Sequence, residues 1–369
     1  MRTRYFLTCL VFVLIGDILC HAQSVNAYFV GHSLVGHTIP NMLEDLASDD
    51  DEVTYLASRQ VINGSPLKYN WENPDKGEVG NYRADLATGT YNHLIVTEAV
   101  PLINHLTWSN SYNMADSFYS YLNRFASNPT FFVYETWHCI NSGRPEGCNW
   151  DDNDTIPWRK RLDQDRTRWE GIADSVLKRN LGGEVYLVPG GQAMALLFDE
   201  IESGHMTGMT KIEDAFHDDI HLNDTGSYYM ACVMYATLFR KSPEGRTVDT
   251  DHQWGSYNSP GTILGKQLQE LAWRVVCDYD RSGVDCSTNS INNHELNELS
   301  IKWLEYELEL SSTVPVVECQ LLNANGQQLQ SIVVNKTLQV NLTKPEKPGI
   351  YIMCVRLSDG SMKYYKFGM

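Results

Sequence analysis

The segment that decides the fold reads Tyr28-Phe29-Val30-Gly31-His32-Ser33-Leu34. Its apolar residues have the character of a buried strand that ends at Gly31, and the apolar spacing that follows it predicts a helix. A serine on the turn between a first strand and a helix lies at the carboxyl edge of an open α/β sheet, where such folds hold their reactive groups. Ser33 is therefore the first candidate site residue, although most loop serines only cap a helix or complete a turn.

Four more apolar segments alternate with helical patterns and predict the rest of this sheet. Strands that alternate with helices favour a parallel sheet covered by helices on both faces, so the predicted fold class is α/β. The strands are expected at 53–57, 93–98, 130–138 (with its exit) and 184–189, and the longest helices at 158–181, 227–240 and 263–276.

The sequence pattern changes near Leu299, where short segments of alternating apolar and polar residues begin. Segments at 303–310, 316–322, 330–334, 337–342 and 349–357 predict a small C-terminal antiparallel β-sandwich with hairpin connections. The chain of 369 residues fits one large domain followed by such a module. We therefore expect a domain at 23–288, a linker at 289–298 and a β-sandwich at 299–369.

Residues 1–22 are interpreted as a signal peptide. Arg2 and Arg4 precede an apolar core, and Ala22 closes a small-residue cleavage site. A membrane anchor and a lipid-modified Cys20 are the alternatives. Asp17 interrupts the apolar run and leaves it shorter than a membrane-spanning helix requires. The residues before Cys20 are not the small ones that lipid attachment requires. We expect a secreted or cell-surface protein without membrane insertion.

Charge and cysteine content agree with export. The formal net charge of −17 disfavours nucleic acid as a partner and favours neutral or weakly charged substrates. The sequence has no CxxC pair, which argues against a zinc ribbon. Local proximity predicts three disulfides and leaves Cys232 as a buried thiol; the predicted pairs are Cys139 with Cys148, Cys277 with Cys286, and Cys319 with Cys354.

A candidate base lies far along the chain from Ser33, in the segment Asp218-Asp219-Ile220-His221 before an apolar helix. For a serine hydroxyl to attack a carbonyl, a base must take its proton and a further group must orient the base. An Asp-x-x-His element supplies both from one loop. The alternative is that a histidine among acids forms only a surface ion pair.

The combination of these motifs resembles the SGNH, or GDSL-type, hydrolases over about Val25 to Arg240. The resemblance rests on Gly-x-Ser-Leu after the first strand, a glycine after the second, and Asp-x-x-His-x-Asn before the last helix. It implies a flavodoxin-like three-layer α/β/α sandwich and ester hydrolysis through an acyl-serine intermediate, with no metal and no cofactor. It also implies Ser33 as nucleophile, His221 and Asp218 as base and partner, and the backbone N–H groups of Ser33 and Gly64 as oxyanion donors.

Two positions depart from this family. His32 stands where the family usually has an aspartate, and Thr97-Glu98-Ala99 stands where the family has a block with a third, asparagine donor. Asn104 and Asn113 are candidate replacements. The loss of one oxyanion donor typically costs ~100- to 1000-fold in rate. A catalytically silent glycan-binding or surface protein on the same scaffold is therefore the rival hypothesis.

Three further residues are expected at the same edge of the sheet. Glu98 is predicted to bind a sugar hydroxyl, Trp137 to stack on a sugar ring, and His138 to make a polar contact. A packed aromatic residue and a loop histidine are the alternatives for the last two. The export signal, the aromatic content and the family analogy predict that the esterase removes small acyl groups, such as acetyl, from a glycan.

The C-terminal segment carries a second resemblance. Residues 321–327, 349–352 and the basic end at 363–367 are similar to the type IX secretion sorting domain of Bacteroidota. The resemblance implies passage across the outer membrane and the type IX secretion machinery as a partner. A carbohydrate-binding module is the alternative for the same β-sandwich.

Overall fold

The computed structural model describes residues 23–286 and 299–368, apart from 180, 254, 304–306, 324–326, 344, 346, 348, 349 and 359–361. The predicted signal peptide and the predicted linker lie outside the described residues. The chain divides into two compact units between Val284 and Asp285, and each unit is described by itself.

A parallel five-stranded sheet forms the centre of the first unit, with the strand order β2-β1-β3-β4-β5. Its central strands are apolar on both faces, and every residue of β4 is buried, so both faces need cover. The strands are β1 (Gln23–Gly31), β2 (Val53–Val61), β3 (His93–Val96), β4 (Thr130–Tyr134) and β5 (Glu184–Val188).

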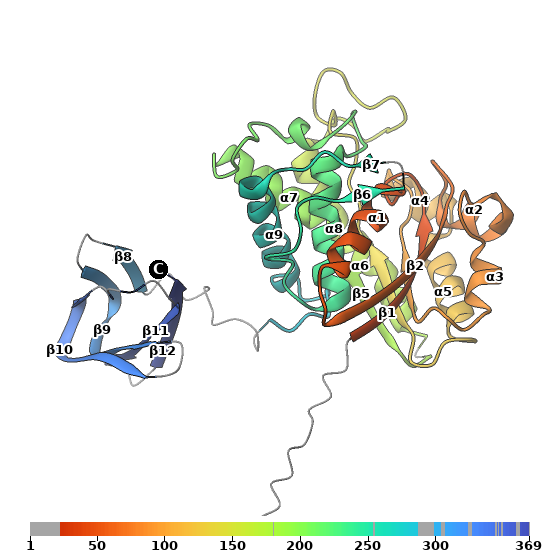
Figure 1. Ribbon diagram of the computed structural model, residues 1–369. Coiled ribbons are helices and arrows are strands. Elements are labelled where there is room, and N and C mark those ends of the chain that lie inside the picture. The colour runs from red at the N-terminus through yellow and green to blue at the C-terminus, as the bar shows by residue number, and fades with distance from the viewer. Residues whose placement is uncertain are drawn as a thin grey trace, which may run out of the picture. The chain divides into compact units, whose positions relative to one another are not determined.

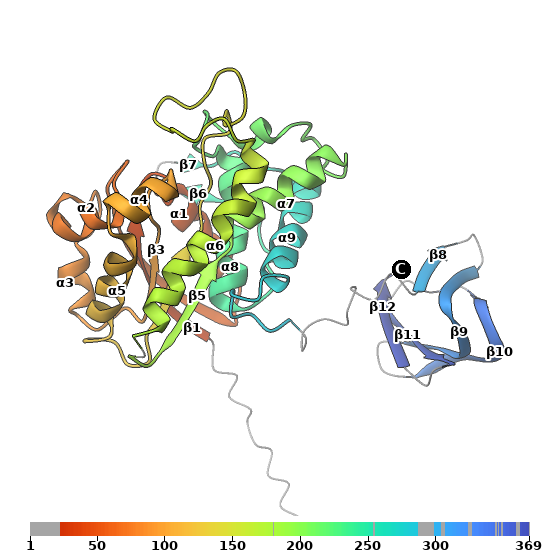
Figure 2. The ribbon, with the colours of Figure 1, turned by 180° about the vertical axis from the view of Figure 1, so that it is seen from behind.

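Helices cover both faces of this sheet, which confirms the predicted α/β fold class and its three layers (Figures 1 and 2). One face carries α1 (Thr38–Ser48), α8 (Asp224–Phe239) and α9 (Thr262–Cys277). The other carries α5 (Ser111–Leu122) and α6 (Trp158–Leu177). Helix α8 is buried on all sides from Gly226 onward because it contacts β1 and β5, α1 and α9.

Short elements follow the carboxyl ends of the strands. After β2 come α2 (Leu67–Glu72), η1 (Pro74–Lys76) and α3 (Tyr82–Leu86), and after β3 comes α4 (Leu102–Trp108). After β5 come α7 (Gly190–Glu202) and η2 (Ile212–Ala215). A hairpin of two short strands, β6 (Asp251–His252) and β7 (Gly255–Ser256), precedes α9. None of the helices among the described residues has the length and apolar character to span a bilayer.

The second unit is an antiparallel sheet of β8 (Leu299–Trp303), β9 (Glu307–Asn323), β10 (Gln328–Thr343), β11 (Ile350–Leu357) and β12 (Met362–Gly368). Residues 307–310 and 316–322, predicted in separate strands, share one long strand, β9, whereas Trp303 ends β8. The first part of β9 pairs with β8 and its last part with β11, while β10 runs along both. The sheet therefore encloses a small core of its own.

The cysteines follow the prediction in part. Cys139 and Cys148 form a disulfide, Cys277 and Cys286 are disulfide-bonded, and Cys232 is a free, buried thiol. The predicted bond between Cys319 and Cys354 is wrong, since both are free. Cys319 pairs with Val355 across β9 and β11, so Cys354 is one position out of register and points to the opposite face of the sheet.

Candidate active site

Ser33 lies on a tight turn between β1 and α1. The backbone N–H groups of Val35 and Gly36 both donate to the carbonyl oxygen of His32, at 2.9 and 3.1 Å. Gly36 has a φ of 56°, a left-handed conformation that favours glycine. Gly31 is needed for close packing, because a Cβ there would lie 2.7 Å from the side chain of Thr97. These constraints place the half-buried Ser33 at the carboxyl edge of the sheet.

His221 lies on a loop that is closed on itself just before α8. An isolated β-bridge joins Phe216 to Leu222, and the N–H of His217 donates to the carbonyl oxygen of His221 at 2.8 Å. Asn223 caps α8 by accepting a hydrogen bond from the N–H of Gly226 at 3.0 Å. The loop and the helix cap together hold His221 at the N-terminal end of α8.

The structure brings Ser33, His221 and Asp218 into a continuous chain of hydrogen bonds. The distance between Ser33 Oγ and His221 Nε2 is 2.9 Å, and the distance between His221 Nδ1 and Asp218 Oδ2 is 2.7 Å. Asp218 Oδ1 also accepts the backbone N–H of Ile220 and of His221, at 2.9 and 2.7 Å. Such a chain can move the serine proton onto the imidazole while the carboxylate holds the ring in place.

Asp218 is held in its ionised form. Burial acts to raise its pKa, but the backbone N–H groups of His221 and Ile220 and the His221 side chain outweigh burial and keep the pKa of the carboxyl below its ordinary value. The side chains of Asp218 and His221 are 44% and 42% exposed. A substrate can therefore approach the imidazole from solvent.

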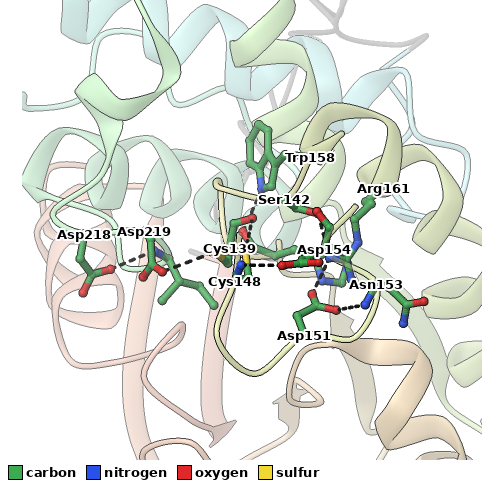
Figure 3. The surroundings of a disulfide bond; sticks show 12 residues. Cys139, Ser142, Cys148, Asp151, Asn153, Asp154, Trp158, Arg161, Asp218 and Asp219 are labelled. Carbon is green, nitrogen blue, oxygen red and sulfur yellow. Dashed lines mark hydrogen bonds and ion pairs between the residues drawn. A yellow bond between two sulfur atoms is a disulfide. The ribbon is translucent and has the colours of Figure 1, made fainter. Parts of the chain in front are cut away.

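The exit of β4 fixes the backbone on which His221 sits. The indole N–H of the fully buried Trp137 donates to the carbonyl oxygen of Ile220 at 2.8 Å. The N–H of Ile140 donates to the carbonyl oxygen of Asp219 at 2.7 Å. Figure 3 shows Cys139, which lies in the segment after β4, beside Asp218 and Asp219. The backbone carbonyls of the two residues before His221 are thus held by the segment that follows β4.

The segment from Cys139 to Pro157 is stabilised by a disulfide and by a buried ion pair (Figure 3). Arg161 of α6 forms a buried ion pair with Asp151 and donates to Ser142 Oγ at 3.0 Å. Removing one partner of such a pair would leave a buried charge without compensation. The segment therefore forms a firm support for the loop of Asp218 and His221.

The turn after β2 lies against the end of β1 and carries Gly64. The N–H of Ile62 and the side-chain amide of Asn70 donate to the carbonyl oxygen of Gly31, at 3.0 and 3.2 Å. Gly64 has a φ of 66°. Within the part of the chain that the structure describes, the backbone N–H groups of Ser33 and Gly64 have no hydrogen-bond acceptor.

A small pocket of about 70 Å³ opens beside Ser33 and His221. Its apolar wall comes from the turn after β1, from α1, from the exit of β4 and from the loop before α8. The apolar side chains of this wall are Leu34, Val35, Ile39, Trp137 and Leu222.

The remaining predicted substrate contacts are buried. Glu98 accepts the N–H groups of Leu67 and Ala99 on Oε1, at 3.0 and 2.8 Å, and burial raises its pKa. His138 is paired with Asp165 inside the protein, and Trp137 is fully buried. A sugar ring has no access to these three side chains in this structure. Trp137 reaches the site only as part of the pocket wall.

Within the described residues, neither of the two asparagines considered as extra oxyanion donors forms a hydrogen bond with Ser33. Asn113 is exposed on α5 and donates to Asn110 Oδ1 at 2.8 Å, and Asn104 lies on α4. The buried Asn70 was missed by sequence reasoning. A polar residue on a short, irregular helix carries no pattern that reveals a contact with β1.

Among the described residues, no group of three or more His, Cys, Asp or Glu side chains is arranged to hold a metal ion.

Comparisons with known proteins place no family name on this chain. No family model matches it, and no curated sequence matches it. A solved structure similar to it is a DUF4886 family protein from Bacteroides uniformis, 18% identical, covering 72% of this chain and 99% of that one with a TM-score of 0.47. Another is a carbohydrate esterase family 3 protein from Talaromyces cellulolyticus, 9% identical, covering 58% and 97% with a TM-score of 0.35. A DUF3244 family protein with an immunoglobulin-like β-sandwich from Bacteroides vulgatus is 13% identical and covers 20% and 94%, with a TM-score of 0.17.

Proposed function

We propose that this protein is a serine esterase that works through an acyl-serine intermediate. The observation that carries the proposal is the hydrogen-bond chain from Ser33 Oγ through His221 to Asp218. His221 takes the proton of Ser33 as Oγ attacks the ester carbonyl, and then gives that proton to the departing alcohol. In the second step His221 takes a proton from water as the water oxygen attacks the acyl carbonyl, and it then gives that proton to Ser33 Oγ as the free acid leaves.

The backbone N–H groups of Ser33 and Gly64 are proposed as the oxyanion donors. Donors that are already in place where charge develops favour the transition state over the bound substrate. Support comes from the turn that carries Gly64, which is hydrogen-bonded to Gly31, and from the absence of another acceptor for either N–H within the described residues. Each such donor is typically worth ~100- to 1000-fold in rate.

The proposed substrate is a small acyl group, such as acetyl, carried by a glycan. The small size of the pocket beside Ser33 and its apolar wall support the acyl part. The glycan part is supported by the predicted export signal and by the aromatic content of 11%.

We propose that the protein is located outside the cytoplasm. The Cys139–Cys148 disulfide supports this location, because such bonds persist in oxidising compartments. The C-terminal antiparallel unit is proposed to act as a type IX sorting domain, on the strength of the sequence resemblance at 321–327 and 349–352.

Labelling with a fluorophosphonate probe tests the proposed function. We expect the wild type to be labelled and Ser33→Ala to remain unlabelled, because the probe reacts only with an activated serine. Ser227→Ala is the matched control, since Ser227 lines the same pocket but is not the residue hydrogen-bonded to His221. A wild-type protein that resists labelling while folded would support the silent glycan-binding alternative.

Trp137→Phe should lower kcat for an acetyl ester roughly 10- to 100-fold, because the carbonyl of Ile220 loses its donor and His221 becomes less well placed. Trp158→Phe is the control. Trp158 is also buried and donates its indole N–H at 2.8 Å, but its acceptor is the carbonyl of His138. Steady-state kinetics together with thermal melts check the prediction. Equal losses of kcat in both variants would contradict it.

A further inference from the structure

A buried histidine stands directly before Ser33 and has no part in the proposed proton transfer. The His32 side chain is 4% exposed, and its Nε2 lies 3.1 Å from the carbonyl oxygen of Glu98. A carbonyl oxygen only accepts, so Nε2 carries the hydrogen. Nδ1 is then the acceptor for the N–H of Leu34, a longer contact of 3.4 Å. The hydrogen-bond partners of the two ring nitrogens therefore determine the tautomer of His32, with the hydrogen on Nε2.

The charge state of His32 agrees with this assignment. Burial lowers its pKa to about 4, against the opposing effect of the hydrogen bond to the Glu98 carbonyl. His32 is thus neutral throughout the range in which histidines ordinarily titrate. It acts as a fixed connection between the turn of Ser33 and the end of β3.

Glu98 extends this connection to the turn of Gly64. Its backbone carbonyl accepts the His32 hydrogen, and its Oε1 accepts the N–H of Leu67 at 3.0 Å. Leu67 is the first residue of α2 and lies three positions after Gly64. Oε1 also accepts the N–H of Ala99 at 2.8 Å, which holds the carboxyl group against its own backbone. The buried Glu98 is therefore hydrogen-bonded both to the turn of Ser33, through His32, and to the start of α2 after Gly64, through Leu67.

We propose that His32 and Glu98 are positioning residues that hold the turns of Ser33 and Gly64 so that their N–H groups converge on one oxyanion. The inference rests on the proposed esterase function. It gives a role to the two positions at which this chain departs from the family it resembles. Donors must be held within about 0.5 Å of productive geometry to be effective. A link between the two turns supplies that restraint.

Four substitutions separate geometry from charge. Glu98→Gln keeps an Oε1 acceptor for both N–H groups, whereas Glu98→Ala removes it. His32→Gln places an amide donor near the position of Nε2, and His32→Asn places an amide oxygen near that of Nδ1. His93→Gln is the control, since His93 is a partly buried histidine that begins β3 at its amino end. Thermal melts establish that each variant is folded.

We expect Glu98→Ala to lower kcat for p-nitrophenyl acetate roughly 10- to 100-fold, with KM changed less than about threefold, because the lost restraint acts in the transition state. Glu98→Gln should restore kcat to within about threefold of wild type. His32→Asn should lose more kcat than His32→Gln, because it breaks the shorter link, the one to the Glu98 carbonyl. His93→Gln should match wild type.

The possible outcomes are distinguishable. An active, folded wild type with kcat unchanged in Glu98→Ala overturns the positioning role and leaves the esterase proposal standing. An equal loss in Glu98→Gln and Glu98→Ala also overturns it, since the carboxyl charge and not its geometry would then matter. A folded wild type without activity or fluorophosphonate labelling overturns both proposals.

Discussion

Alanine in place of Ser33 or His221 should lower kcat for p-nitrophenyl acetate hydrolysis by about 10⁴- to 10⁶-fold. The reason is that Ser33 Oγ and His221 Nε2, 2.9 Å apart, share the proton that moves in the first step. Because the two groups act as a unit, the double variant should be no slower than either single variant. Initial rates on purified protein with matched circular dichroism spectra provide the measurement.

The pH dependence of the same reaction provides a further check on this unit. The pKa of Asp218 lies below its ordinary value, so its carboxylate is ionised throughout the range in which a histidine titrates. Activity should therefore rise with pH in a single step, because a general base accepts a proton only in its unprotonated form. Constant kcat/KM between about pH 5 and about pH 8 would contradict the role of the histidine as base.

Glu135→Gln should make the protein more stable than wild type at alkaline pH, by an amount that grows with pH. Glu135 is 1% exposed at the end of β4, and burial raises its pKa to about 8 from an ordinary 4.5, against the hydrogen bonds of Gln192. Between these two values the folded protein holds a proton that the unfolded chain has released. The unfolding free energy of the wild type therefore falls by about 1.4 kcal/mol per pH unit, on the order of 5 kcal/mol in total.

Denaturant titrations of both proteins at several pH values from 4 to 9 measure this difference. Glutamine resembles the protonated acid, so the two proteins should have similar stability below about pH 4.5 and differ most above about pH 8. The comparison cancels other titrating groups, including Glu98, whose pKa burial also raises. A constant difference across the pH range would mean that Glu135 is not held protonated in the folded state.

Much of the fold follows from local pattern. Each predicted strand of the first unit overlaps an observed one, because a strand buried on both faces must be apolar throughout, as β4 is. The C-terminal unit was less accessible to this reasoning. The break expected between 310 and 316 does not interrupt β9, since strand continuity there depends on pairing with β8, β10 and β11 and not on the segment itself.

Side chains that follow a strand were harder to place. Trp137 and His138 leave β4 at the expected edge, yet both are buried. Residue type and position on an edge do not reveal whether the next segment will cover a side chain. Here the segment after Cys139 folds over the strand exit and is held there by its disulfide and by Arg161.

The sequence by itself determined the alternation of strands and helices, the serine on the first turn, and the Asp-x-x-His spacing, because each is a relation among near neighbours in the chain. Only the tertiary structure decided that Ser33 and His221, 188 residues apart, are in hydrogen-bond contact. It also decided that His32 and Glu98 connect two turns of the site. Such contacts depend on the packing of several strands and helices at once, and no local pattern encodes the direction in which a buried side chain meets a distant partner.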